Sequence, residues 1–193
     1  LWARALTVAA GPAFNFILSI LLFLALILTQ GRPSEPLTVA SLAPLPPAYG
    51  QGLAAGDEVV AVAGLPVTAA GGFEGDPAAL PAEPVVDWTI RRGGQAMVVP
   101  GPHPVPTLVA GVNPDSAAWD AGLQAGDVVT AVDGRAVVAF DQLVAAVTES
   151  AGAPLRLIVW RAGESLDFTL LPRRTDLPLP EGGFETRWLI GLT

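Results

Sequence analysis

The sequence predicts an α+β protein: one transmembrane helix, then two similar domains, each a small barrel-like sheet with two helices. Three observations lead to this prediction. Residues 5–28 form a long uncharged apolar run near the N-terminus. Residues 122–134 repeat the pattern of residues 52–64, seventy positions further along the chain. After the run, short β-type apolar segments alternate with apolar residues at helical spacing, which is typical of a mixed fold.

Composition restricts the function. The chain has 193 residues, a formal net charge of −8, no Cys and one His. A protein that binds nucleic acid needs a basic stripe, so no nucleic-acid partner is expected. The absence of Cys excludes a disulfide framework and any thiolate metal site.

The apolar run is long enough to cross a membrane. No charged residue lies between Arg4 and Arg32. A helix needs about 20 apolar residues to span a bilayer core, whereas the apolar region of a cleaved signal peptide has about 7–15. We therefore predict a transmembrane helix within residues 1–31. Because an Arg flanks the run on each side, the positive-inside rule leaves its orientation open.

Three residues inside the run are unusual for a plain anchor. Gly11 lets another backbone approach closely, Pro12 favours a bend or a helix start, and Asn15 needs a polar partner in hydrocarbon. Two interpretations are open. The motif forms a helix-packing site in which Asn15 bonds a neighbouring helix, or it lies beside a reaction centre or substrate path.

The second copy has the clearer pattern. Ser116 is expected to cap a short helix that ends at Gly122, and Gly152 is expected to end a longer one. The expected order is strand, short helix, strand, strand, helix, strand, strand. The elements fall at 106–112, 117–121, 128–132, a short strand after the turn at 133–134, 140–151, 155–160 and 166–171.

The first copy is expected to be similar but weaker. The offset of seventy aligns further pairs without an insertion: Tyr49 with Trp119, Val67 with Val137, Pro84 with Pro154, Arg91 with Arg161, and Gly93 with Gly163. Residues 70–80 correspond to the long helix but contain three Gly and one Pro. Gly costs about 1 kcal/mol per helical position and Pro about 3, so this helix should be short or absent. Asp57 and Asp127 occupy equivalent turns and are expected to be structural.

We predict four segments. Residues 1–31 are the transmembrane helix and its flank, 32–104 the first domain, and 105–172 the second domain. Residues 173–193 are expected to form a connector toward a following membrane segment. Within it, residues 184–192 either approach the membrane, since Trp188 suits a membrane interface, or pair with a sheet edge.

Two motifs resemble known families. The pattern Ser116-Ala117-Ala118, Ala121-Gly122-Leu123, Gly126-Asp127 and Asp133-Gly134 resembles bacterial PDZ domains with permuted strand order. Arg4-Ala5, Ala10-Gly11-Pro12 and Asn15-Phe16 resemble the second core helix of RseP-type site-2 proteases. Such proteases carry tandem PDZ domains outside the membrane, so the resemblance covers essentially the whole chain.

The resemblance implies the activity of a parent protein. That parent would be a zinc metalloprotease, a hydrolase of the bacterial inner membrane that performs regulated intramembrane proteolysis. Its PDZ pair would lie on the periplasmic side. Its substrates would be transmembrane proteins such as anti-sigma factors or signal-peptide remnants, and Gly11, Pro12 and Asn15 would line the protease core.

The zinc ligands of that family do not occur here. In the family, His-Glu-x-x-His on the preceding helix and an Asp from a Leu-Asp-Gly motif on a later helix hold zinc. This chain has only His103, between prolines, and Asp133-Gly134, in a soluble strand pattern. We therefore expect no catalytic residue and no bound metal in this chain, zinc elsewhere in the parent, and no activity of the chain alone.

A peptide groove is predicted in the second domain, since PDZ domains bind a peptide as an added strand. Its lining is expected from one strand and the long helix: Leu108, Val109, Ala110, Val112, Phe140, Leu143, Val144 and Val147. Three prolines before that strand remove amide donors and argue against a carboxylate nest. Either the second domain alone keeps a usable groove, or neither binds tightly and the pair gates the membrane site. A non-enzymatic membrane-anchored PDZ adaptor is the alternative function, although Asn15 favours the protease.

Overall fold

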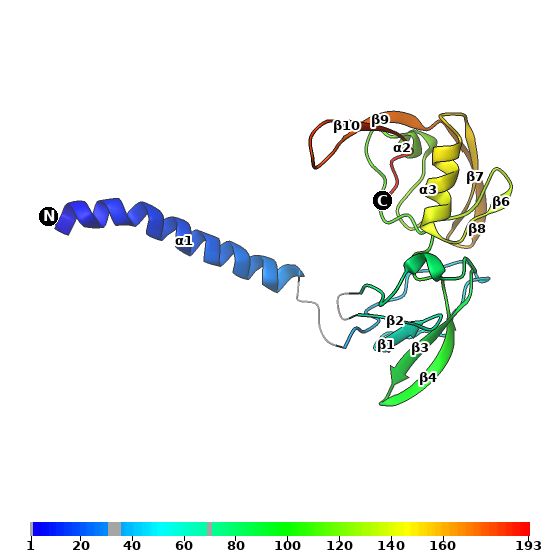
Figure 1. The fold of residues 1–193 in the computed structure, drawn as a ribbon, viewed down its shortest axis with the longest axis horizontal. Helices are drawn as coiled ribbons and strands as arrows, with labels where there is room; N and C mark the ends of the chain where they lie inside the picture. The colour runs from blue at the N-terminus through cyan, green and yellow to red at the C-terminus, as the bar shows by residue number, and fades with distance from the viewer. Residues whose placement is uncertain (1, 31–35, 69–70) are drawn as a thin grey trace.

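A computed structural model describes residues 2–30, 36–68 and 71–193 of the chain (Figure 1). The predicted boundary at residue 31 lies outside the described residues. A single long helix, α1 (Trp2–Gln30), comes first, and two sheet-containing units follow it. The prediction of one apolar N-terminal helix followed by sheets is confirmed.

Helix α1 continues through Pro12 and begins well before it, so Pro12 does not start the helix. The segment Gly11–Leu28 has a mean hydropathy of 2.3, and none of it is buried against the rest of the protein. A helix this long and apolar meets the requirement for a membrane span. Its length and composition support membrane association of the chain.

The two sheets have the same topology. The first has the order β2-β1-β3-β4, and the second has the order β6-β5-β7-β8. All neighbours are antiparallel, and the central strand of each sheet carries an irregularity at the same place, between Val59 and Ala61 in β1 and between Val129 and Ala131 in β5. The sequence repeat is therefore a repeat of structure. The strands are β1 (Glu58–Val62), β2 (Leu65–Pro66), β3 (Val86–Arg92), β4 (Gln95–Gly101), β5 (Val128–Val132), β6 (Arg135–Ala136), β7 (Leu155–Arg161) and β8 (Glu164–Leu170).

The predicted alignment of the copies is wrong in its second half. Val59 pairs with Ile90, and its equivalent Val129 pairs with Val159, an offset of 69 for the partner strand. Arg92 and Gly94, not Arg91 and Gly93, therefore correspond to Arg161 and Gly163, and Pro84 does not correspond to Pro154. Two adjacent Arg and two adjacent Gly allow both alignments in the sequence. The fold selects one, because a slip of one residue would turn the fully buried Ile90 away from the core.

The second copy contains two helices, α2 (Ala117–Ala121) and α3 (Phe140–Glu149). The Ser116 side chain accepts a hydrogen bond from the Trp119 amide, and Gly122 has a φ of 85°, so both predicted caps are confirmed. Helix α3 ends at Glu149, and its C-cap is Ser150 rather than the predicted Gly152.

The first copy differs from the prediction of two helices per domain. Within residues 36–68 and 71–104 the structure has no α-helix, and only a 3-10 turn, η1 (Pro77–Ala79), marks the region of the long helix. The Gly and Pro content of this region explains the difference, as expected from helix propensity.

The C-terminal segment belongs to the second domain, which corrects its prediction as a connector. Strands β9 (Arg173–Pro178) and β10 (Phe184–Leu189) form a hairpin, and Ile190 then enters the second core. Leu192 pairs with Val112, and Trp188 packs against the same core. The apolar residues that suggested an approach to the membrane are thus used for packing inside the domain.

Candidate functional site

A groove of about 590 Å³ lies between α3 and the segment that follows β10. The helix contributes Phe140, Leu143, Val144 and Val147, four residues predicted to line a peptide groove. Leu143 and Val147 are buried in the core, whereas Val144 is 50% exposed. The apolar face of α3 therefore forms one wall, with Val144 accessible from solvent.

The opposite wall is not the predicted strand. Leu108 pairs with Val128, Val109 is buried in the core, and the Ala110 amide donates to the Thr193 carbonyl at 2.7 Å. Val112 pairs with Leu192. Residues 191–193 thus lie beside residues 110–113, and Leu108, Val109, Ala110 and Val112 do not line the groove.

The wall is formed by Trp188, Leu189, Ile190, Gly191 and Leu192. Sequence reasoning missed this segment because it follows α3 by about forty residues. The available signal was the apolar pattern of residues 184–192, which was interpreted as approaching the membrane or as pairing with a sheet edge.

Residues 190–193 present an unpaired strand edge. The amide of Asn113 donates to the Gly191 carbonyl at 2.9 Å, and the Thr193 amide donates to the Gly111 carbonyl at 3.0 Å. Antiparallel pairing alternates in direction along a strand, so the N–H and C=O of Leu192, between these two residues, face the other way, toward the groove. In residues 36–68 and 71–193 no backbone carbonyl accepts from the amides of Ile190, Gly191 or Leu192.

Gly191 is required where the groove strand passes Ser116, the N-cap of α2. Its φ is 81°, and a Cβ added there would lie 2.2 Å from the Ser116 Cβ. The Ile190 carbonyl accepts from the Ala118 amide, which fixes this segment to the first turn of α2. The glycine therefore allows the groove strand to pass directly over the helix cap.

Trp188, another lining residue, packs against the loop that follows α3. A Cβ on Gly152 would lie 2.6 Å from the Trp188 ring, so the indole packs directly on that backbone. Next to it, Arg187 forms an ion pair with Glu185 at 2.7 Å, and this hydrogen bond raises the pKa of Arg187. Arg187 and its partner Glu185 both line the groove.

The same Asp–Arg ion pair occurs in both copies. Asp127 accepts from the Gln124 amide at 2.9 Å and pairs with Arg161 at 2.6 Å. Arg161 also donates to the Gly122 carbonyl. Asp57 and Arg92 form the same pair at 2.6 Å in the first copy, which agrees with the prediction that the two Asp residues are structural.

The environment lowers the pKa of Asp57. The hydrogen bond from Arg92 is the largest cause, and burial acts in the opposite direction. The hydrogen bonds to Asp57 and Asp127 raise the pKa values of Arg92 and Arg161.

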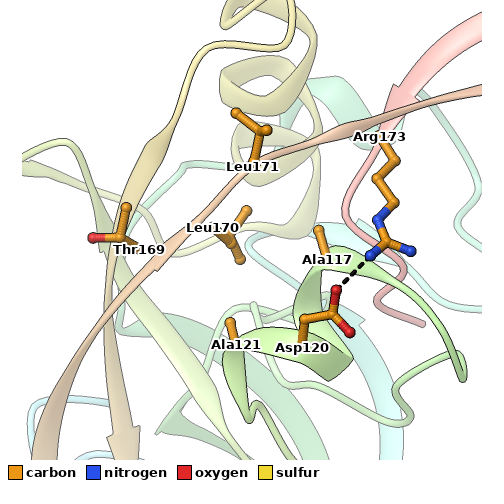
Figure 2. A pocket seen from close by; sticks show the side chains of 7 residues that line it. All are labelled: Ala117, Asp120, Ala121, Thr169, Leu170, Leu171 and Arg173. Carbon is orange, nitrogen blue, oxygen red and sulfur yellow. Dashed lines mark hydrogen bonds and ion pairs between the residues drawn. The ribbon is translucent and has the colours of Figure 1, made fainter.

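A second hollow, of about 320 Å³, lies beside α2 (Figure 2). Arg173 extends over α2, where its guanidinium pairs with Asp120 and donates to the Asp115 carbonyl. Leu170 and Ala117 form the apolar floor. Because both charged groups are bonded to each other, the arrangement attaches the start of β9 to α2 and offers no free catalytic group.

The membrane motif is separate from the groove. Gly11, Pro12 and Asn15 lie on α1, and all three are exposed. A Cβ on Gly11 would meet no atom within 4 Å. The structure therefore does not bring these residues together with any other predicted site residue, and their place in a protease core stays a prediction.

The described residues do not fit a zinc site. His103 is buried, and its Nδ1 accepts from the Val105 amide at 3.2 Å. Over residues 2–30, 36–68 and 71–193, no group of three or more His, Cys, Asp or Glu side chains is arranged to hold a metal. Structural and catalytic zinc sites need three or four protein ligands, so no reaction step can be assigned to zinc bound by these residues.

Comparisons with known proteins agree with this architecture. The family model of the PDZ domain matches residues 108–161. A Vibrio cholerae protein named "Putative zinc metalloprotease" is 30% identical over 92% of this chain and 45% of its own length. Proteins with the same type of name from Rhizobium meliloti and Agrobacterium fabrum are 34% and 28% identical, over 100% and 91% of this chain and 33% and 28% of their own lengths.

The fold and these matches define what the chain resembles: it contains a PDZ domain, and it is similar over almost its whole length to proteins named putative zinc metalloproteases. Its similarity to zinc metalloproteases extends over almost the whole chain, including α1 and both copies. The chain spans less than half the length of these relatives. The PDZ match covers the second copy alone.

Proposed function

We propose that the chain is part of a membrane-embedded zinc metalloprotease that cuts transmembrane substrates. The names of the relatives support a protease parent, and α1 with its Gly11-Pro12 and Asn15 supports an enzyme embedded in the membrane. Zinc and its ligands would come from parts of the parent outside this chain. The PDZ pair would lie on the periplasmic side of the bacterial inner membrane.

The second copy would recognise the substrate through the groove between α3 and Leu192. The free N–H and C=O edge at Leu192 carries this proposal, because an extended peptide can add there as a further strand. An apolar side chain of the peptide would enter between Val144 and the wall formed by Trp188 and Leu192. The groove therefore suits an apolar peptide segment.

The backbone of residues 190–192 suits a C-terminal carboxylate. Its three consecutive amides can receive an anion, as backbone nests do. The prolines that argued against a carboxylate nest precede residue 108 and lie outside this loop. The peptide bound here would thus be a free chain end with an apolar last residue, as a first cleavage of a membrane protein would create.

The first copy would act as a steric barrier near the membrane site and would not recognise peptides. It lacks a counterpart of α3 within residues 71–104, so a groove of the same kind cannot form there. Together, the two copies would limit access of large substrates to the membrane site, while the second copy selects cut ends.

Peptide binding tests the recognition step. Labelled peptides of ten residues ending in Val with a free carboxylate should bind the full chain in detergent micelles, and amidated peptides should bind at least about tenfold more weakly. Val144→Lys should weaken binding to a similar extent, because it places a charge on the apolar wall. Val98→Lys, on an exposed valine of β4 in the first copy, is the matched control. Equal binding of amidated and free peptides would exclude the carboxylate site.

The protease parent is tested separately. The full-length protein should contain about one zinc per chain, and should cut a labelled transmembrane substrate within the membrane. Peptide binding without zinc and without cleavage would instead establish the non-enzymatic PDZ adaptor.

A further inference from the structure

Strand β4 forms the outer edge of the first sheet, and its middle part has no strand beside it (Figure 1). Alternate residues of β4 bond to β3, beginning with the pair that closes the two-residue turn between them. The backbone groups of Ala96, Val98 and Pro100 therefore face away from the sheet. The Pro100 carbonyl agrees with this direction, because it accepts from the Gly52 amide at 2.7 Å. In the part of the chain that the structure describes, no such bond is made by Ala96 or Val98, so their N–H and C=O groups are free.

This edge lacks the charges that commonly protect an edge strand. Residues 95–101 contain no charged side chain, and Val98 is 62% exposed. An uncharged edge with free backbone groups can pair with a strand of another chain, and charged residues prevent such pairing. The equivalent edge of the second copy is protected, since β8 carries Glu164 and Asp167, and Asp167 is paired with Arg156. The turns before β4 and β8 align these strands so that Val98 takes the place of Asp167.

The β4 edge is complementary to itself. When two β4 strands lie antiparallel with Met97 opposite Met97 of the other molecule, Ala96 of each strand pairs with Val98 of the other. All free N–H and C=O groups of these two residues are then bonded, and only uncharged side chains face one another. Pro100, which has no N–H and whose carbonyl is already in use, falls opposite Gly94 at the turn. A shift that placed Ala96 opposite Pro100 would leave the groups of Ala96 unpaired.

We propose that the chain forms a symmetric dimer through the β4 edge, with the two strands antiparallel about Met97. Identical strands that pair in this way are related by a two-fold axis, the commonest symmetry of protein dimers. The segment Gly11–Leu28 is long and apolar enough to span a membrane. Molecules held in one membrane meet in the same orientation and at a raised local concentration, which favours a second molecule over an unrelated strand. No residue of β4 lines the peptide groove, so the two proposals can fail separately.

The absence of Cys from the chain allows a direct test. Met97→Cys places a single thiol on the proposed two-fold axis, opposite the same thiol of the other molecule. Residues paired in this way have Cα atoms about 4.5 Å apart, which is within the range of a disulfide. Mild oxidation of the full chain in detergent micelles should therefore give a covalent dimer. Leu166→Cys, at the equivalent and also partly buried position of β8, is the matched control and should cross-link at least about tenfold more slowly.

Variants of Val98 give an independent test. Val98→Asp introduces the residue of the protected β8 edge, and the dimer dissociation constant, measured by sedimentation in micelles, should rise at least about tenfold. Val98→Thr keeps the size and the strand preference of the side chain and should keep the dimer. Val105→Asp, on an exposed valine outside β4, is the control for added charge and should leave the dissociation constant unchanged. All three variants should bind the C-terminal peptide normally, because none of them alters a residue of the groove.

Three results would overturn the proposal. They are a chain that sediments as a monomer at every concentration, equal rates of cross-linking through Met97→Cys and Leu166→Cys, and a dimer that Val98→Asp leaves intact. The last result would place the contact between molecules outside β4.

Discussion

At the scale of single residues, the same Asp–Arg ion pair stabilises one turn in each of the two domains. Asp57 with Arg92, and Asp127 with Arg161, connect the turn before the central strand to the end of its neighbour. Each Asp is 1% exposed, and each also accepts a backbone amide. Breaking such a pair leaves a buried polar group without its partner, which is the costly case.

Asp57→Asn should change the acid sensitivity of the first copy. The folded pKa of Asp57 is lowered from 3.8 mainly by the hydrogen bond from Arg92. A lowered pKa contributes stability above the unfolded pKa, and this contribution is lost as pH falls through the folded value. The variant should therefore melt below the wild type at pH 7 and approach it as the pH falls below 3.8. Calorimetry in detergent measures this, with Glu83→Gln on the surface as control. A constant difference across this range would contradict the linkage.

Local sequence signals predicted the roles of single residues well. The register of the paired strands could be determined only from the fold. Ser116 and Gly122 were predicted as caps because a side-chain acceptor and a left-handed residue are recognisable within a few positions. Arg92 was missed as the partner of Asp57, because adjacent Arg91 fits the sequence repeat equally well. Only strand pairing distinguishes the two, since it determines which residue points to the core.

At the scale of elements, the groove combines a helix that is visible in the sequence with a strand that is not. The spacing of Phe140, Leu143, Val144 and Val147 predicted α3 and its apolar face. The strand beside it, at residues 190–193, pairs with residues 110–113, about eighty positions earlier. Pairing over such a distance leaves no local signal, so a neighbouring strand was predicted in its place.

Gly191→Ala should displace the groove strand. The substitution forces a residue with a Cβ into a φ of 81° and places that Cβ against Ser116. We expect a loss of about 1–3 kcal/mol in stability and at least about tenfold weaker binding of the C-terminal peptide. Gly163→Ala also has a positive φ but open space around it, so it separates backbone strain from the clash. Normal peptide binding by Gly191→Ala would show that residues 190–193 are not part of the site.

At the scale of the whole molecule, a helix long and apolar enough to span a membrane is followed by one domain without an α3 groove and then by one with it. The second copy has a large continuous core that includes α3 and Ile190, whereas the first core centres on Val59, Val62 and Val86. The duplication was evident from the sequence, and the Gly and Pro content predicted that the long helix of the first copy is short or absent. The unequal roles proposed for the two copies follow from that loss.

The side of the membrane on which the two copies lie can be tested with the full-length gene cut after Thr193. Arg4 and Arg32 flank the span equally, so their charges do not select an orientation. The proposed function requires the periplasmic side, where a free chain end left by a first cleavage would meet the groove. Alkaline phosphatase fused after Thr193 should therefore be active in a bacterial host, and a green fluorescent protein fused there should remain dark. The opposite pattern would place the groove in the cytoplasm, and substrate recognition would then have to precede any extracellular cut.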